Sequence, residues 1–266
     1  MAPFPTLPWT VGKSHRLRQH ASQTLDVLFP RLCFGCDTPL EGSDPPIPRL
    51  DTWLCRPCQT SLPLIEPPYC SYCGEPYPGD LTHDFRCWNC QDLHFNFDFA
   101  TSGYRAEGLI RDLIHAFKYE NHYELRGLLA VLLRQSLTDK RLTDFPDLTT
   151  DWLLVPVPLH PWREMLRGYN QSRELAIELS RTTGIPTQNA LRRSRYTLAQ
   201  AGLDRDRRLR NLRSAFSLRP NHTVRGRRIL LIDDVLTTGS TAQECARVLQ
   251  RDGGAEKVVV ITVARG

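Results

Sequence analysis

Two adjacent aspartates followed by a turn rich in hydroxyl groups are the residues of this sequence best suited to chemistry. Asp233 and Asp234 follow an aliphatic run, Ile229 to Ile232. The turn after them contains Thr237, Thr238, Gly239, Ser240 and Thr241. Neighbouring carboxylates accept hydrogen bonds from a vicinal diol, and N–H and hydroxyl groups at the start of a helix bind phosphate. The spacing therefore predicts a site for a phosphorylated sugar such as ribose 5-phosphate.

The run from Arg228 to Thr241 resembles the 5-phosphoribosyl-1-pyrophosphate (PRPP) motif of type I phosphoribosyltransferases. That motif reads aliphatic strand, two acids, two apolar residues and Thr-Thr-Gly-Ser/Ala-Thr, and every position agrees. A simpler interpretation is a buried strand that ends in a solvated acidic turn, with Thr241 and Glu244 forming a capping box for the next helix. This alternative explains the acids but not the Thr-Thr-Gly-Ser run.

Eight of the nine cysteines form four C-x-x-C pairs before residue 91. The paired residues are Cys33, Cys36, Cys55, Cys58, Cys70, Cys73, Cys87 and Cys90. Two such pairs complete a closed four-thiolate zinc site with a structural role. Because short loops close at lower entropic cost, we expect the first pair to combine with the second and the third with the fourth, rather than in a cross-braced pattern. The sequence thus predicts two structural Zn²⁺ sites, and Cys245 is expected to be a small buried residue.

The uneven distribution of cysteine predicts a domain of ordinary size with a small appendage in this chain of 266 residues. We expect an N-terminal arm or helix over 1–30, a double zinc ribbon over 31–95 and a phosphoribosyltransferase-like domain over 100–266. No long apolar run or secretion signal is present, which predicts a cytoplasmic protein without a membrane segment. In that reducing compartment paired cysteines favour metal binding over disulfides.

Positive charge is concentrated in one segment. The net charge is +5, but residues 181–228 contain thirteen arginines, no lysine and two acids, so this segment carries about +11. Such a segment could close over a polyphosphate substrate, lie along nucleic acid or form a solvated helix face. Its part from Asp204 to Ser214 is the best candidate for a mobile lid.

Helix and strand patterns begin near residue 100. Apolar residues recur at helical spacing from Leu109 to Phe117 and again from Leu125 to Leu132, and Lys118 between them is expected to be an exposed helix-end lysine. A strand is predicted from Trp152 to Pro158, where its prolines stop the ladder. Two further strands are expected, Ile185–Leu191 and Val258–Val263. This alternation predicts an α/β fold with a parallel sheet flanked by helices.

A second anion site is predicted in the loop from Leu159 to Gln171. It contains Arg163, Arg167 and Gly168, and it leads into a helix that should end at Gly184. Two strand-loop-helix units at one edge of a parallel sheet could hold the two ends of one ligand.

Taken in order, these blocks resemble the ComF family, late-competence proteins that are phosphoribosyltransferase-like and carry an N-terminal zinc ribbon. The resemblance covers nearly the whole chain. It rests on the Leu32-Cys33-x-x-Cys36 opening, Phe117-Lys118-Tyr119, Val155-Pro156-Val157-Pro158, Arg167-Gly168-Tyr169-Asn170-Gln171, Gln200 with Arg207 and Asn211 ahead of Ala215-Phe216, and the PRPP motif. Many members have one four-cysteine site, whereas the eight ligands here resemble a double-ribbon version.

The resemblance implies displacement of pyrophosphate from Mg-PRPP by a nitrogen acceptor, which the sequence does not identify. Asp233 and Asp234 would bind the ribose hydroxyls, directly or through water on Mg²⁺, because Mg²⁺ prefers oxygen ligands. Thr237, Thr238, Gly239, Ser240 and Thr241 would hold the 5-phosphate. Arg167 and Gly168 would bind the pyrophosphate.

A second function, not exclusive of the first, is DNA handling during natural transformation. In this alternative the zinc ribbons and the arginine-rich segment bind single-stranded DNA or a competence helicase partner, and the pocket for PRPP is a sensor or a remnant. The oligomeric state stays open, with a homodimer as one arrangement.

Overall fold

The computed structural model describes residues 30–41, 45, 47–80, 85–91, 95–143, 147–194, 215–220 and 222–266. The expected N-terminal arm, apart from residue 30, and the expected lid from Asp204 to Ser214 lie outside these ranges. So do Gln200, Arg207 and Asn211 of the family blocks. None of the described helices combines the length and apolar character needed to span a bilayer.

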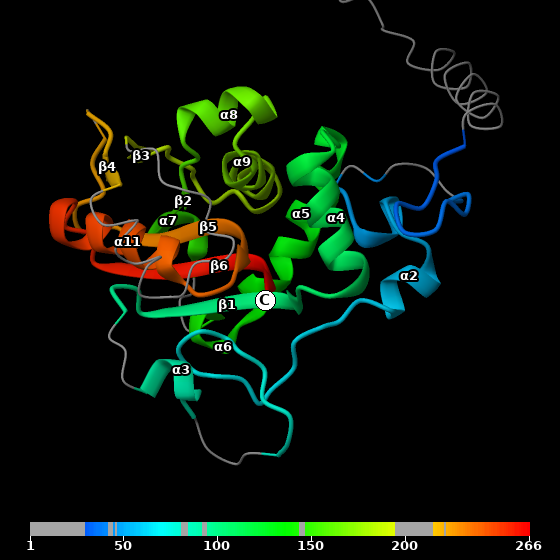
Figure 1. Cartoon of the computed structure of the whole chain (residues 1–266), viewed down its shortest axis with the longest axis horizontal. Coiled ribbons are helices and arrows are strands. Elements are labelled where there is room, and N and C mark those ends of the chain that lie inside the picture. The colour runs from blue at the N-terminus through cyan, green and yellow to red at the C-terminus, as the bar shows by residue number, and fades with distance from the viewer. Residues whose placement is uncertain are drawn as a thin grey trace, which may run out of the picture.

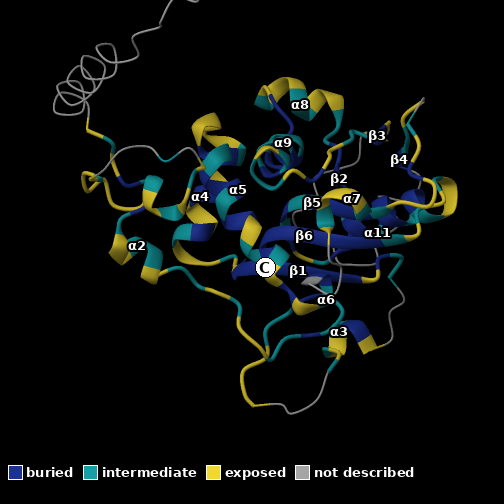
Figure 2. Cartoon of the chain, turned by 180° about the vertical axis from the view of Figure 1, so that it is seen from behind, coloured by how far each residue is buried: buried dark blue, intermediate teal, exposed yellow. Residues whose placement is uncertain are grey.

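A parallel sheet of four strands forms the centre of the molecule (Figure 1). Its strands are β1 (Phe99–Arg105), β2 (Trp152–Pro156), β5 (Arg228–Leu236) and β6 (Lys257–Arg265). The order across the sheet is β1-β6-β5-β2, and each neighbouring pair is parallel. The central strands β5 and β6 are buried along most of their length (Figure 2), as their continuous aliphatic runs predict.

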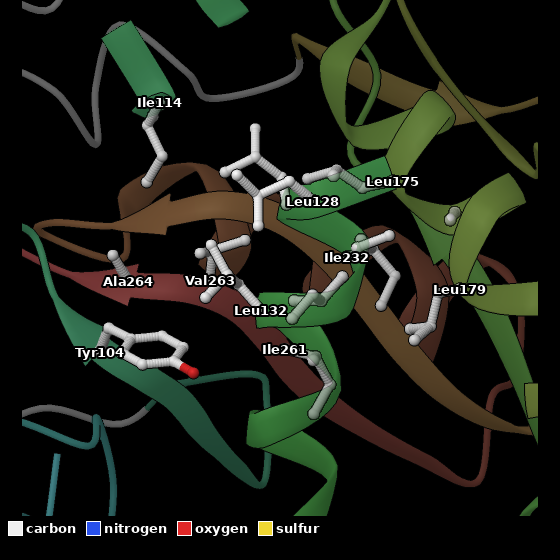
Figure 3. Close-up of a cluster of buried hydrophobic side chains, with 14 of the residues drawn as sticks. Tyr104, Ile114, Leu128, Leu132, Leu175, Leu179, Ile232, Ile261, Val263 and Ala264 are labelled. Carbon is white, nitrogen blue, oxygen red and sulfur yellow. The ribbon is translucent and has the colours of Figure 1, made fainter. Parts of the chain in front are cut away.

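Alternate residues of β5 point to opposite faces of the sheet and pack in two separate hydrophobic cores. Leu230 and Ile232 pack on one face, against α4 (Gly108–Tyr119), α5 (Arg126–Leu133) and α9 (Gln171–Thr183). Figure 3 shows part of this core, in which Leu132, Leu179 and Ile261 surround Ile232. Ile229 and Leu231 pack on the opposite face with helix α11 (Ser240–Arg247). The sheet is therefore covered on both sides, which confirms the predicted α/β architecture.

Short elements complete the described part of the chain. They are η1 (Leu50–Thr52), α2 (Arg56–Thr60), α3 (Trp88–Gln91), η2 (Tyr123–Leu125), η3 (Arg134–Thr138), α6 (Lys140–Thr143), α7 (Leu148–Asp151), α8 (Pro161–Arg167), β3 (Leu191–Arg193), β4 (Phe216–Leu218) and η4 (Val248–Asp252). Helix α9 ends at Gly184 in the left-handed conformation, as its sequence predicts.

Two segments differ from the sequence-based prediction. The strand expected over Ile185–Leu191 is wrong: within the described chain it contributes a bridge between Thr187 and Leu154, because Pro186 supplies no ladder donor. Strand β3 begins at Leu191 and pairs with β4 in an antiparallel ribbon outside the main sheet. The loop expected over Leu159–Gln171 contains α8, which has Pro161 in its first turn and ends at the left-handed Gly168.

The cysteine-rich segment packs on both cores of the sheet domain. Cys33 and Leu54 belong to the same buried cluster as α4 and α5. Cys70, Cys73 and Cys90 form a small cluster of their own. Tyr72 and Phe95 pack between this cluster and the second core, which contains Ile229 and Leu231. The zinc ribbon segment, drawn in blue and cyan in Figure 1, therefore lies against the sheet domain rather than apart from it.

Candidate functional site

Three elements meet at the two aspartates near the carboxyl end of β5. Asp234 is 2% exposed, and its Oδ1 lies 2.8 Å from the Nζ of Lys118 on α4. Asp233 Oδ1 accepts a hydrogen bond of 2.8 Å from the hydroxyl of Ser172, in the first turn of α9. It also accepts one of 3.0 Å from the backbone N–H of Asp234. These contacts hold both acids in position at the edge of the sheet.

Lys118 is not the exposed helix-end lysine that the sequence predicts. Its side chain is 20% exposed and pairs with a carboxylate whose side chain is 4% exposed. Helix α4 ends beside the carboxyl edge of the sheet, so the side chain reaches Asp234 instead of solvent. Burial disfavours the ammonium, but the nearby Asp234 outweighs this effect and raises the pKa of Lys118. Periodicity gave no signal for this contact, and only the Phe117-Lys118-Tyr119 block singled the lysine out.

The environment of the acid pair leaves unused capacity to accept hydrogen bonds. Burial, together with the charge of Asp234, raises the pKa of Asp233 from 3.8 to about 7, although Lys118 and Ser172 oppose the shift. Asp234 Oδ2 is buried and has no hydrogen-bond partner among the described residues. A buried carboxylate oxygen without a donor fits a ribose hydroxyl, or a water molecule on Mg²⁺.

The turn after β5 leads directly into helix α11. Gly239 is the N-cap of α11 with a φ of 74°, a left-handed conformation that favours glycine. The hydroxyls of Thr238 and Ser240 lie 3.0 Å apart. The capping-box alternative is wrong, because Thr241 lies inside α11 and Glu244 pairs with Arg247 at 3.0 Å.

A cleft of about 1060 Å³ runs along this edge of the sheet. Its lining includes the predicted residues Arg167, Gly168, Asp233, Asp234, Thr237 and Thr241. Thr238, Gly239 and Ser240 complete the same turn beside it without lining the cleft. Arg167 donates to Gln171 Oε1 at 2.5 Å, and its guanidinium lies 5.2 Å from the ring centre of Tyr119. The structure thus brings the two predicted anion loops to one cleft.

Two contributors to this cleft region, Arg193 and Ser172, were not predicted from the sequence. Arg193 of β3 lines the cleft and is 7% exposed, and burial, followed by the charge of Arg163, lowers its pKa. The only sequence signal was its place in the basic segment. Ser172 gave no signal, because its role depends on how α9 packs beside β5.

The cysteines gather in two groups of four. The sulfurs of Cys33, Cys36, Cys55 and Cys58 lie within 4.8 Å of one another, and so do those of Cys70, Cys73, Cys87 and Cys90. Backbone N–H groups point at the first sulfur of each group, from Cys55 at 3.2 Å and from Cys87 at 3.3 Å. Four thiolates at this spacing fit one tetrahedral Zn²⁺ per group. The sequential pairing is confirmed, and Cys245 is buried as expected.

These features define an α/β protein with a four-stranded parallel sheet, a cleft at the sheet edge and N-terminal zinc ribbons. A family model described as "Double zinc ribbon domain" matches residues 24–91. The chain is 36% identical over 215 residues to competence protein F of Haemophilus influenzae, covering 80% of this chain and 90% of that protein. It therefore belongs to the ComF family of competence and DNA-utilization proteins.

Two further relatives agree with this assignment. DNA utilization protein YhgH of Escherichia coli K12 is 33% identical over 242 residues, covering 86% of this chain and 95% of the relative. Competence protein ComFC of Bacillus subtilis is 29% identical over 228 residues, covering 81% and 85%. Among solved structures, the glutamine PRPP amidotransferase from B. subtilis aligns at 22% identity and a TM-score of 0.32, over 55% of this chain and 26% of that one.

Proposed function

We propose that this protein binds Mg-PRPP and transfers its phosphoribosyl group to a nitrogen acceptor. The observation that carries this function is the pair of acids in the same cleft as a hydroxyl-lined turn, with one buried acid oxygen that has no donor among the described residues. The acceptor nitrogen would form a bond to C1 as the bond from C1 to the pyrophosphate oxygen breaks. The nitrogen would then lose a proton to solvent. Positioning and charge stabilisation supply most of the catalysis in such a reaction.

Each predicted residue has a role in this proposal. Asp233 and Asp234 accept hydrogen bonds from the ribose hydroxyls, directly or through water on Mg²⁺. The turn holds the 5-phosphate through its N–H and hydroxyl groups, contributed by Thr237, Thr238, Gly239, Ser240 and Thr241. Arg167 and Gly168, at the end of α8, bind the pyrophosphate. When bound, Mg²⁺ would offset the negative charge of the polyphosphate.

The domain boundaries are part of the same proposal. The sheet begins at Phe99, so the transferase-like domain is assigned to 100–266, the double zinc ribbon to 31–95 and the arm to 1–30. We also assign the protein to the cytoplasm, where PRPP would be available to it.

Calorimetric titration with Mg-PRPP is the first test, and we expect one binding site per chain. Release of pyrophosphate should then be measured with a panel of nitrogen bases and amines. Absence of PRPP binding by a fully zinc-loaded protein would exclude the transferase function. Binding without turnover by any acceptor would instead favour a sensor.

A second candidate function is handling of DNA, which the names of the relatives support, since they are competence and DNA-utilization proteins. The zinc ribbons and the arginine-rich segment would bind single-stranded DNA or a helicase partner. The salt dependence of binding to single-stranded DNA tests this, because neutralised phosphates give a steep slope. A steep slope with no turnover of PRPP favours this second function.

A further inference from the structure

Arg265, at the end of β6, connects the second cysteine group, Cys70 to Cys90, to the turn over 237–241 that is proposed to hold the 5-phosphate and is called the phosphate turn below. It is 8% exposed. Its Nη2 lies 2.5 Å from Glu75 Oε2 and 3.8 Å from Cys73 Sγ. Its Nη1 donates to the carbonyl of Leu236 at 2.9 Å, and Leu236 is the residue before Thr237. One guanidinium therefore contacts both a zinc ligand and the entrance of the turn.

A second contact reaches the middle of the same turn, at Gly239. Tyr72, from the second cysteine group, packs on Phe95 with ring centres 5.6 Å apart, and Phe95 stacks on Phe97 at 4.6 Å. A Cβ at Gly239 would lie 3.5 Å from the ring of Phe95, so the aromatic stack touches the turn itself. Next to these rings, the N–H of residue 96 donates to Gln243 Oε1 of α11 at 2.6 Å.

The first cysteine group has different neighbours. Gly35 lies against Cys58 and Leu109, so this group packs on α4. The two groups have the same ligands but, within the described chain, only the second contacts the phosphate turn in these ways. This difference supplies an internal control.

We propose that the second zinc site holds the phosphate turn in its binding conformation, with Arg265 as the positioning residue. A Zn²⁺ ion with four thiolates carries a net charge of −2, and buried donors to such thiolates fix and stabilise the site. Loss of this metal would release Arg265 from Cys73 and weaken the hydrogen bond that Arg265 donates to the carbonyl of Leu236. The occupancy of one zinc site then controls the affinity for the phosphorylated ligand, an extension that rests on the proposed function.

The test compares Arg265→Met and Cys73→Ser with Cys36→Ser, which removes a ligand of the first site. Hydrogen exchange of the backbone amides from 237 to 241 is measured in each protein after purification with excess zinc and metal analysis, followed by titration with Mg-PRPP. We expect Arg265→Met and Cys73→Ser to speed exchange in the turn and weaken PRPP binding about tenfold, the lower end of effects for residues that support metal ligands. Cys36→Ser should leave exchange in the turn unchanged.

Glu75→Gln, at a half-exposed partner of Arg265, gives a milder perturbation if Arg265→Met does not fold. It should speed exchange in the turn by a smaller factor while two zinc ions remain bound. Unchanged exchange in Arg265→Met and Glu75→Gln would overturn the proposal. So would equal effects of Cys36→Ser and Cys73→Ser, which would indicate general destabilisation. If the native protein binds no PRPP, the proposed function fails, but the exchange experiment still decides whether the zinc site braces the turn.

Discussion

The ammonium of Lys118 and the carboxylate of Asp234 form a buried ion pair of 2.8 Å between the end of α4 and the carboxyl edge of the sheet. Such a pair is weak grounds for high stability, because desolvation of both groups offsets their attraction. The main effect of the pair is to fix the positions of the two side chains. The pair holds one acid in a fixed orientation beside the cleft, and the other oxygen of that acid is buried without a hydrogen-bond partner among the described residues.

Replacement of Lys118 by Met should lower the free energy of unfolding by about 3–5 kcal/mol, because it leaves Asp234 buried without a counter-charge. Urea denaturation measures this change. Adding Asp234→Asn should recover part of the loss. Arg181→Met is the control, since Arg181 forms an exposed pair with Glu178 at 3.1 Å and should cost no more than about 1 kcal/mol. Equal losses in the two variants would contradict the importance of burial.

Changing both Asp233 and Asp234 to Asn should abolish binding of Mg-PRPP. The amides keep the shape of the carboxylates but lose the charge that the diol and magnesium-bound water require. Circular dichroism should show a folded protein, with reduced stability because Lys118 loses its partner. Asp252→Asn, at a half-exposed acid away from the cleft, is the matched control. Unchanged affinity in the double variant, measured by calorimetry, would refute the assignment of these acids.

Binding of PRPP should weaken as the pH falls below about 7, the pKa of Asp233. Below that pH the free protein holds a proton on Asp233, which must leave before the carboxylate can accept from the ribose. The affinity should therefore fall by up to about tenfold per pH unit below 7 and level off above it. Calorimetry between pH 6 and 8 gives the profile, and Asp233→Asn should remove its dependence on pH.

The same shift predicts the pH dependence of stability in the free protein. Asp233 has a folded pKa of about 7 against an ordinary value of 3.8, so the native state retains a proton that the unfolded chain releases. Its contribution to stability should therefore decline as the pH rises from 3.8 to about 7 and stay constant above that. A rise in this contribution over the same window, measured as the difference between the native protein and Asp233→Asn, would contradict the shift.

The purified protein should contain two zinc ions per chain. Cys36→Ser should reduce this to one, and Cys245→Ala should retain both, because Cys245 lies in the core away from either group. Metal analysis with a colorimetric chelator measures the content. Strong chelators should unfold the ribbon segment, since folding and metal binding are coupled in such small modules. A metal-free protein with an unchanged ribbon would disprove the structural role of the ions.

The sequence predicts those parts of the site that are local in the chain. The C-x-x-C pairs, the run from β5 through the turn to α11, and the ends of α9 depend on residues close to one another. Lys118 and Ser172 could not be assigned in this way, because their contacts with the acids join elements far apart in sequence. The position of Arg193 likewise depends on the pairing of β3 with β4, which the expected strand over Ile185–Leu191 did not anticipate.

The placement of β6 between β1 and β5 has a consequence for biosynthesis. Strand β1 emerges early from the ribosome, but its neighbour in the sheet is made only after residue 256. At elongation rates of about 5–20 residues per second, β1 waits on the order of ten to thirty seconds with unpaired backbone N–H and C=O groups on the edge that β6 later occupies. The nascent chain is therefore expected to depend on chaperones during this interval.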